Sequence, residues 1–365
     1  IIHPVWREYR DNWLTTIKVI DPAGRKEFLA NSDLTSLKRP GLYYYSASLV
    51  YSIFNQQNFL WRFYSVRFFS LILHIITVWL VFQIAIKITK KNQLSLAAAA
   101  WVGFMPGLSF ISSGVTYEPL AILTVTLFFY LISCKVKLIW LILTASVGVF
   151  IKPDLIFMFF LLPRVWLALP LVLAGFYFMA PIVDQTVRGA YPWLNQWLYL
   201  LPLKDFSVYS RDLVNLLFSG RLPELILNYS RQFMSIHYAQ IFPWYWGVFG
   251  WLEKTMPGIV YSVLKLFTLI SFFGITKIWP RARWLVKAIL IQAAVVIIND
   301  ILVFSQTGEL YGIQGRYFYP AISLQMILFT WGLNHWLKSK YLIAGAIGLN
   351  LIGLYSLTQY FGWVW

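Results

Sequence analysis

Apolar runs alternate with short polar or basic breaks along most of the chain. The longer runs have about 20 residues, the length of a membrane-spanning helix. We interpret ten of the runs as membrane segments, at 63–86, 94–112, 117–134, 138–151, 154–163, 165–183, 258–276, 284–305, 318–336 and 341–363. The run at 41–55 is too short to cross a bilayer core of roughly 30 Å and predicts a helix at the membrane surface. The pattern therefore predicts an all-α polytopic transmembrane bundle with outer-face interfacial helices.

Two polar stretches divide this pattern into four regions. We expect an outer-face loop with juxtamembrane helices at 1–60, a first transmembrane bundle at 61–183, an outer-face region with an aromatic belt at 184–256, and closing transmembrane helices at 257–365. The first residue is Ile1 rather than Met, and a polar segment follows it. We therefore expect a longer natural chain, with a span or a signal sequence before Ile1.

The composition supports a membrane location. The chain is 59% hydrophobic and 12% charged, with a mean hydropathy of +0.65, whereas soluble domains are about 25% charged. The net charge of +16 suggests nucleic-acid binding at first, but the basic residues lie where membrane topology and anionic lipid headgroups explain them. The single cysteine, Cys134, excludes a disulfide framework.

The charged residues also predict an orientation. Lysine and arginine are enriched in the short loops on the inner side of a membrane. If the first span runs inward, the inside loops hold Lys87, Lys90, Lys91, Lys135, Lys137, Arg164, Lys277, Arg281, Arg283, Lys287, Lys338 and Lys340. All 14 acidic residues then fall on the outer side. We therefore expect the polar chemistry at the outer face.

Three motifs at that face carry candidate chemistry. Glu118 opens a span and is followed by Pro119; ionisable groups at membrane depth are costly and usually functional, although an acid at a helix start also complements the helix dipole. Lys152-Pro153-Asp154 interrupts an apolar run, where the lysine is available to a phosphate or to Asp154. Arg316 lies just before Tyr317, in a loop separate from the other two motifs. Its guanidinium suits a phosphate or a lipid headgroup.

Other features bear on the function less directly. We expect Asp300 to pair with Arg316 or Lys265 in a purely structural role. The aromatic run at 242–251 suits a lipid tail or a sugar face, or simple interfacial anchoring. His3, His74, His237 and His335 show no metal-ligand spacing. The chain has no Walker A loop and no Ser nucleophile elbow, so a soluble nucleotide is not the expected substrate.

The motifs in this order resemble the GT-C superfamily of membrane glycosyltransferases. Arg39-Pro40-Gly41-Leu42-Tyr43-Tyr44 is similar to that superfamily's basic-Pro-Pro-Leu-Tyr-Tyr turn, and Arg62-Phe63-Tyr64-Ser65 is similar to its Arg-x-x-Ser. Glu118 and Lys152-Pro153 match its later acid and Lys-Pro. The likeness is to protein O-mannosyltransferases and lipid A aminoarabinose transferases. Two further motifs, Trp246–Trp251 and Gly315–Pro320, resemble a less characterised bacterial branch.

The resemblance implies an inverting transferase that takes a sugar from a polyprenyl-phosphate donor at the outer face. The family's catalytic acid falls near Glu8 and Asp11, although Arg7-Glu8 stands where the family has Asp-Glu. Glu118 would orient the acceptor or a basic residue. The expected substrate-binding residues are Arg39, Tyr43, Arg62, Lys152, Arg316 and Tyr317.

The resemblance also implies partners and a location. The partners are the polyprenyl-phosphate sugar, membrane lipids, and a glycan, lipid or protein acceptor, with no nucleic acid. No cofactor is required, and a divalent metal stays open because some superfamily members use one. The expected location is a bacterial-type inner membrane, with the site on the periplasmic side. A flippase or transporter of a lipid-linked saccharide, and a non-catalytic membrane scaffold, remain as alternatives.

Overall fold

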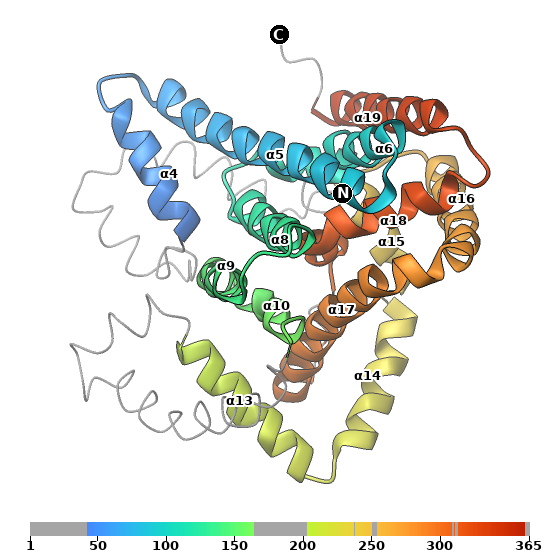
Figure 1. The fold of residues 1–365 in the computed structure, drawn as a ribbon. Coiled ribbons are helices and arrows are strands. Elements are labelled where there is room, and N and C mark those ends of the chain that lie inside the picture. The colour runs from blue at the N-terminus through green and yellow to red at the C-terminus, as the bar shows by residue number, and fades with distance from the viewer. Residues whose placement is uncertain are drawn as a thin grey trace.

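The structure is a computed structural model that describes residues 42–163, 203–236, 238–249, 254–308, 310 and 313–361. These residues are almost entirely helical, as the sequence predicted (Figure 1). The one sheet among them is a two-stranded antiparallel ribbon in which β1 (Val248–Phe249) pairs with β2 (Lys254–Thr255). The predicted segment at 165–183 and the start of the chain lie outside the described residues.

Within the described part of the chain, four helices are long and apolar enough to cross a membrane. They are α5 (Phe59–Thr89), α16 (Gly258–Lys277), α17 (Trp279–Thr307) and α19 (Ser339–Phe361). Helix α6 (Asn92–Gly103) and helix α7 (Pro106–Ser112) are together long and apolar enough to count as a fifth span, which is bent by 60° at the break between them. Long apolar helices of this kind indicate an integral membrane protein.

The ten predicted segments are not confirmed, because several of the runs form shorter helices. Helix α8 (Glu118–Ser133), helix α9 (Leu138–Ile151) and helix α18 (Ile322–Leu333) are below the length of a span. The run at 154–163 forms a 3₁₀ turn, η1 (Pro153–Ile156), and the four-residue α10 (Phe157–Phe160). The run at 318–336 begins in a second 3₁₀ segment, η3 (Gly315–Ala321).

Prolines account for the breaks in these runs. Met105 and Lys152 precede Pro106 and Pro153, and both have extended backbone, as expected for a residue before proline. Pro320 lies inside η3. Proline removes a helical hydrogen bond and clashes with the preceding turn, so hydrophobicity alone overestimates how far each helix continues.

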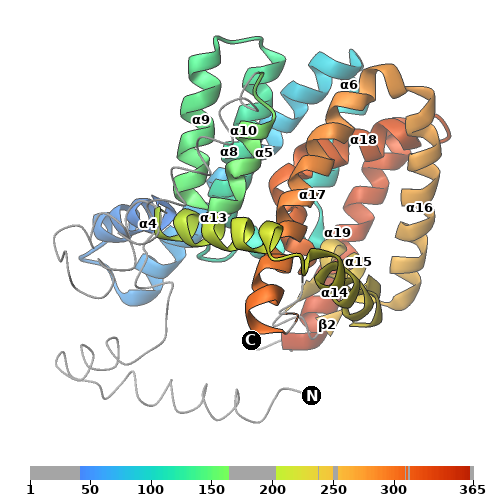
Figure 2. The ribbon, with the colours of Figure 1, turned by 90° about the horizontal axis from the view of Figure 1, so that it is seen from below.

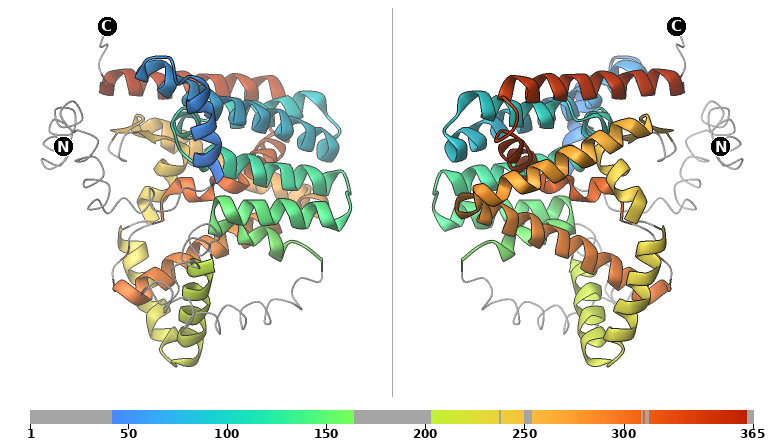
Figure 3. Two further views of the ribbon diagram at one scale, coloured as in Figure 1. Left: turned by 90° about the vertical axis from the view of Figure 1, so that its left-hand side faces the viewer. Right: turned by 90° about the vertical axis from the view of Figure 1, so that its right-hand side faces the viewer.

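One end of the bundle is crossed by helices that lie across the spans. These are α4 (Leu42–Ile53), α13 (Leu203–Phe218) and α14 (Leu222–Ile236) (Figures 2 and 3). The predicted surface helix at 41–55 is thus confirmed as a helix, α4. The loop between α8 and α9 and the loop between α16 and α17 lie at the opposite end (Figure 2). These two loops carry Lys135, Lys137 and Lys277.

The core lies where α6, α8, α18 and the short α15 (Tyr238–Trp246) meet. Trp101 makes edge-to-face ring contacts with Trp246 and Phe329. Trp246 is only 2% exposed, and Phe249 is fully buried. These two residues therefore belong to the packed interior, whereas the aromatic belt expected for the whole run stays a prediction.

Candidate functional site

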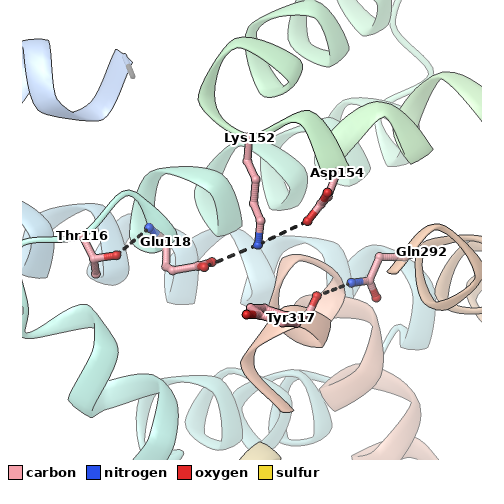
Figure 4. Close-up of polar contacts among 6 residues, drawn as sticks. All are labelled: Thr116, Glu118, Lys152, Asp154, Gln292 and Tyr317. Atoms are coloured by element: carbon pink, nitrogen blue, oxygen red, sulfur yellow. Dashed lines mark hydrogen bonds and ion pairs between the residues drawn. The ribbon is translucent and has the colours of Figure 1, made fainter. Parts of the chain in front are cut away.

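A buried cluster of charged side chains lies where α8, the end of α9 and η1 meet. The Lys152 Nζ is 3.4 Å from Oε1 of Glu118 and 3.7 Å from Oδ2 of Asp154. Figure 4 shows the ammonium group between the two carboxylates. The sequence predicted that Lys152 would face either Asp154 or a phosphate, and in the structure it contacts both acids.

Local sequence explains how each charge reaches this point. Glu118 is the first residue of α8, and Pro119 follows it in the first turn, where a missing backbone N–H costs nothing. A carboxylate at this position also complements the positive end of the helix. Lys152 ends α9 in extended backbone before Pro153, and Leu155 N donates to Lys152 O at 3.0 Å. The proline break therefore turns the lysine toward α8.

Glu118 and Lys152 are shielded from solvent, whereas Asp154 is partly exposed. Glu118 is 4% exposed and Lys152 is 7% exposed. Burial by itself lowers the pKa of Lys152, but the neighbouring carboxylates of Glu118 and Asp154 outweigh burial and raise that pKa above its usual value. Lys152 is therefore a cation throughout the physiological pH range.

Two tyrosine rings flank the ammonium group. The Lys152 Nζ lies 5.8 Å from the ring centroid of Tyr117 and 5.2 Å from that of Tyr317, within the range of a cation–π interaction. Gln292 of α17 fixes the backbone of Tyr317, because its Nε2 donates to Tyr317 O at 2.8 Å. Helix α17 is thereby linked to the cluster (Figure 4).

The segment η3 brings Arg316 to the edge of the cluster. Arg316 is exposed, and its Cζ lies 5.8 Å from the ring centroid of Tyr317. Tyr319 anchors this segment by donating from its hydroxyl to Tyr245 O of α15 at 2.7 Å. Any Cβ on Gly315 would overlap the Tyr245 backbone nitrogen, so the start of η3 requires glycine.

Helices α4 and α5 support the turn that precedes Glu118. Arg67 Nε donates to Ser113 O at 2.6 Å, which ties α5 to that turn. The Tyr43 hydroxyl is hydrogen-bonded to Ser70 Oγ at 2.7 Å. Tyr43 is fully buried, so in this structure it docks α4 on α5, and its expected contact with substrate stays a prediction.

Glu118 and Lys152, at the centre of the cluster, can each form a further hydrogen bond. Glu118 Oε2 is buried and has no hydrogen-bond partner among the residues that the structure describes. An ammonium group has three donors, and the two carboxylates account for two directions around Lys152. A buried acceptor without a partner is costly, so a ligand that donates to Glu118 and accepts from Lys152 would satisfy both groups.

The predicted site residues fall into three groups. Glu118 and Lys152 are in direct contact, and Tyr317 and Arg316 lie beside them. Arg62 lies in the first turn of α5 with its Cζ 4.0 Å from the Tyr51 ring centroid. Glu8, Asp11 and Arg39 lie outside the described residues.

Other residues of the site were not predicted. Arg67, Tyr117 and Gln292 support or flank the cluster. For Arg67 and Gln292, the one indication in the sequence is that each is a polar residue within an apolar run. Asp300, expected as a partner of Arg316 or Lys265, accepts a hydrogen bond from Tyr229 OH at 2.9 Å. Among the described residues, no group of three or more His, Cys, Asp or Glu side chains could hold a metal ion.

The chain matches no protein-family model, no curated protein and no solved structure. The fold and the site define a helical integral membrane protein with a buried charged cluster at the helix ends.

Proposed function

We propose that this protein is an integral membrane glycosyltransferase of the GT-C type. It would transfer a sugar from a polyprenyl-phosphate donor to an acceptor at the outer face of a bacterial-type inner membrane. The observation that supports this best is the buried Glu118–Lys152–Asp154 cluster beside Arg316. A lipid-linked phosphate presents its charge at the membrane surface while its tail stays among apolar helices.

Arg316 is the main candidate for contact with the donor phosphate. Its guanidinium is exposed next to the cluster, and arginine binds phosphate through two parallel hydrogen bonds. The ammonium group of Lys152 has one N–H donor left for a phosphate oxygen. Arg39 and Arg62 remain proposed contacts of the donor phosphate. Fixed cations in a poorly hydrated site stabilise the charge that develops on a leaving phosphate.

The acceptor hydroxyl would be held and deprotonated by carboxylates. Glu118 is assigned the positioning role, since its free Oε2 can accept a hydrogen bond from that hydroxyl. Glu8 or Asp11 would act as the general base and take the proton. The acceptor oxygen then bonds to the anomeric carbon while the bond from that carbon to the phosphate oxygen breaks. One such displacement inverts the anomeric centre.

The direct test is label transfer in membranes that contain the full-length protein. Labelled polyprenyl-phosphate sugars are supplied, and loss of label from the donor is measured. Arg316→Ala and Glu118→Gln should each reduce transfer by two orders of magnitude or more, on the order of 10². Arg281→Ala, in the first turn of α17 at the opposite end of the bundle, is the matched control and should leave transfer unchanged. Transfer that both site variants retain in full would contradict the assignment.

A flippase for a lipid-linked saccharide is the second candidate. The bent pair of α6 and α7 favours it, because interrupted helices are common in transporters. The two functions differ in their products. Protein-dependent movement of the lipid across the bilayer, without release of the sugar, would support the flippase and exclude the transferase.

A further inference from the structure

An amphipathic surface helix has one buried apolar face and one exposed polar face. Helix α14 has an additional face, which is both exposed and apolar. A face directed at the protein contains Leu222, Leu225, Tyr229 and Phe233. A second, exposed face is apolar and contains Ile226, Leu227 and Met234, which are 43%, 50% and 60% exposed. The third face is exposed and polar and contains Glu224, Asn228, Arg231 and Ser235. Successive residues turn by about 100° around a helix, so the exposed apolar residues, with the exposed Ser230 among them, lie between the inward-facing set and the polar set.

The first face is fixed against α17. Tyr229 is 5% exposed and donates its hydroxyl to Asp300 Oδ2 at 2.9 Å. Its ring also contacts the rings of Phe233 and Phe304. Because this contact sets the rotation of α14, the exposed apolar face is directed away from α17.

The position of α14 in the molecule indicates what covers that apolar face. Helices α13 and α14 form a V that projects sideways from the bundle (Figure 1) and lies across the direction of the spans (Figure 2). At the tip of the V, Leu217 is 55% exposed and Phe218 is 86% exposed. Gly220, with φ of 66°, makes the turn into Arg221. A lateral arm at the end of a membrane bundle runs parallel to the bilayer surface.

We infer that the arm formed by α13 and α14 lies in the interface of the bilayer that the long helices cross. The tip and the face with Ile226, Leu227 and Met234 enter the boundary between headgroups and acyl chains, and the polar face meets water. Amphipathic helices with separate apolar and polar faces bind membranes in this way. The exposed Arg221 and Arg231 complement anionic headgroups. This inference does not depend on the proposed sugar transfer.

Two adjacent residue pairs allow a sharp test on the full-length protein. In a Cys134→Ser background, single cysteines are introduced at Leu227 and Asn228, and at Met234 and Ser235. Each is labelled with a small fluorophore, and the protein is reconstituted into phosphatidylcholine–phosphatidylglycerol vesicles. Quenching by lipids with a nitroxide near the headgroup is compared with quenching by aqueous iodide. All four side chains are exposed, so the substitutions spare the core.

We expect lipid quenching to be several-fold stronger at Leu227→Cys and Met234→Cys than at their neighbours, and iodide quenching to show the reverse order. Equal iodide quenching within each pair would place the arm in water and overturn the inference. Protection of 227 and 234 from both quenchers would also overturn it, since a protein surface, either residues 164–202 or a second copy, would then cover the face.

Discussion

At the scale of single residues, one lysine decides how the candidate site is organised. Lys152 neutralises Glu118 and contacts Asp154, while Tyr117 and Tyr317 exclude water around the ammonium group. A buried ion pair adds little net stability, because desolvating the two charges offsets their attraction. Removing one partner has a larger effect, since the other charge stays buried and uncompensated.

Replacing Lys152 by Met should therefore destabilise the protein by about 3–5 kcal/mol. The additional Glu118→Gln substitution should recover much of this loss, because it removes the unpaired buried charge. Lys137→Met, at an exposed lysine, is the control and should stay within about 0.5 kcal/mol. Thermal unfolding in detergent measures all three variants. A double variant less stable than Lys152→Met alone would contradict the pairing.

The pH dependence of this effect follows from the raised pKa of Lys152. A folded-state pKa above the unfolded value gives stability that is fully present below the unfolded pKa, about 10.4 for lysine. That stability is lost only as the pH rises through the higher folded value. The difference in melting temperature between the native protein and Lys152→Met should thus be the same at pH 7 and pH 9. A difference that disappears by pH 9 would show that the carboxylates do not hold the proton.

At the scale of elements, close approach of backbones joins the helices. A Cβ on Gly274 of α16 would overlap Gly332 O of α18, and a Cβ on Gly332 would overlap Ser271 O. Small residues let membrane helices pack closely without a hydrophobic driving force. Ser271 adds a hydrogen bond from its Oγ to Phe329 O at 2.9 Å.

Gly274→Ala should force α16 away from α18 and destabilise the protein by about 1–3 kcal/mol, the usual cost of overpacking. Gly348 of α19 is the matched control, because nothing lies within 4 Å of the Cβ that alanine would add there. Gly348→Ala should be neutral or stabilise by up to about 1 kcal/mol, since alanine favours the helix. Melting temperatures of the two variants that fall by the same amount would argue against the close contact.

At the scale of the whole molecule, the distribution of lysines and the arrangement of helices both distinguish one end of the bundle from the other. The lysine-bearing loops α8–α9 and α16–α17 lie at one end, and α13 and α14 cross the other (Figure 2). From the positive-inside rule we expect the lysine-bearing end to face the cytoplasm. The candidate site lies at the C-terminal end of α9 and at the start of α8. It is therefore at the far end of both helices from the loop that joins them.

Membrane vesicles of known orientation test this arrangement. In a Cys134→Ser background, Lys137→Cys should react with an impermeant maleimide only in inside-out vesicles, because it would lie on the cytoplasmic side. Arg221→Cys, in the turn between α13 and α14, should react only in right-side-out vesicles. Reaction of both cysteines from the same side would contradict the topology.

The sequence by itself determined the helical membrane class and the position of α5, α16, α17 and α19, and it singled out Glu118 and Lys152, which are in contact in the structure. These features depend on local hydrophobicity, and on charges in a place where charge is costly. The ten predicted spans are not confirmed among the described residues, where breaks at Pro106, Pro153 and Pro320 interrupt apolar runs that hydropathy alone predicts to be continuous.

Only the tertiary structure decided which side chains meet. The Lys152–Glu118 contact joins residues far apart in the chain, and the roles of Arg67, Tyr117 and Gln292 depend on how α5, α8 and α17 pack. The same holds for Tyr43 and Trp246, whose side chains suit a membrane surface but are buried in the fold. Hydropathy describes one residue at a time, whereas burial and pairing depend on contacts between helices.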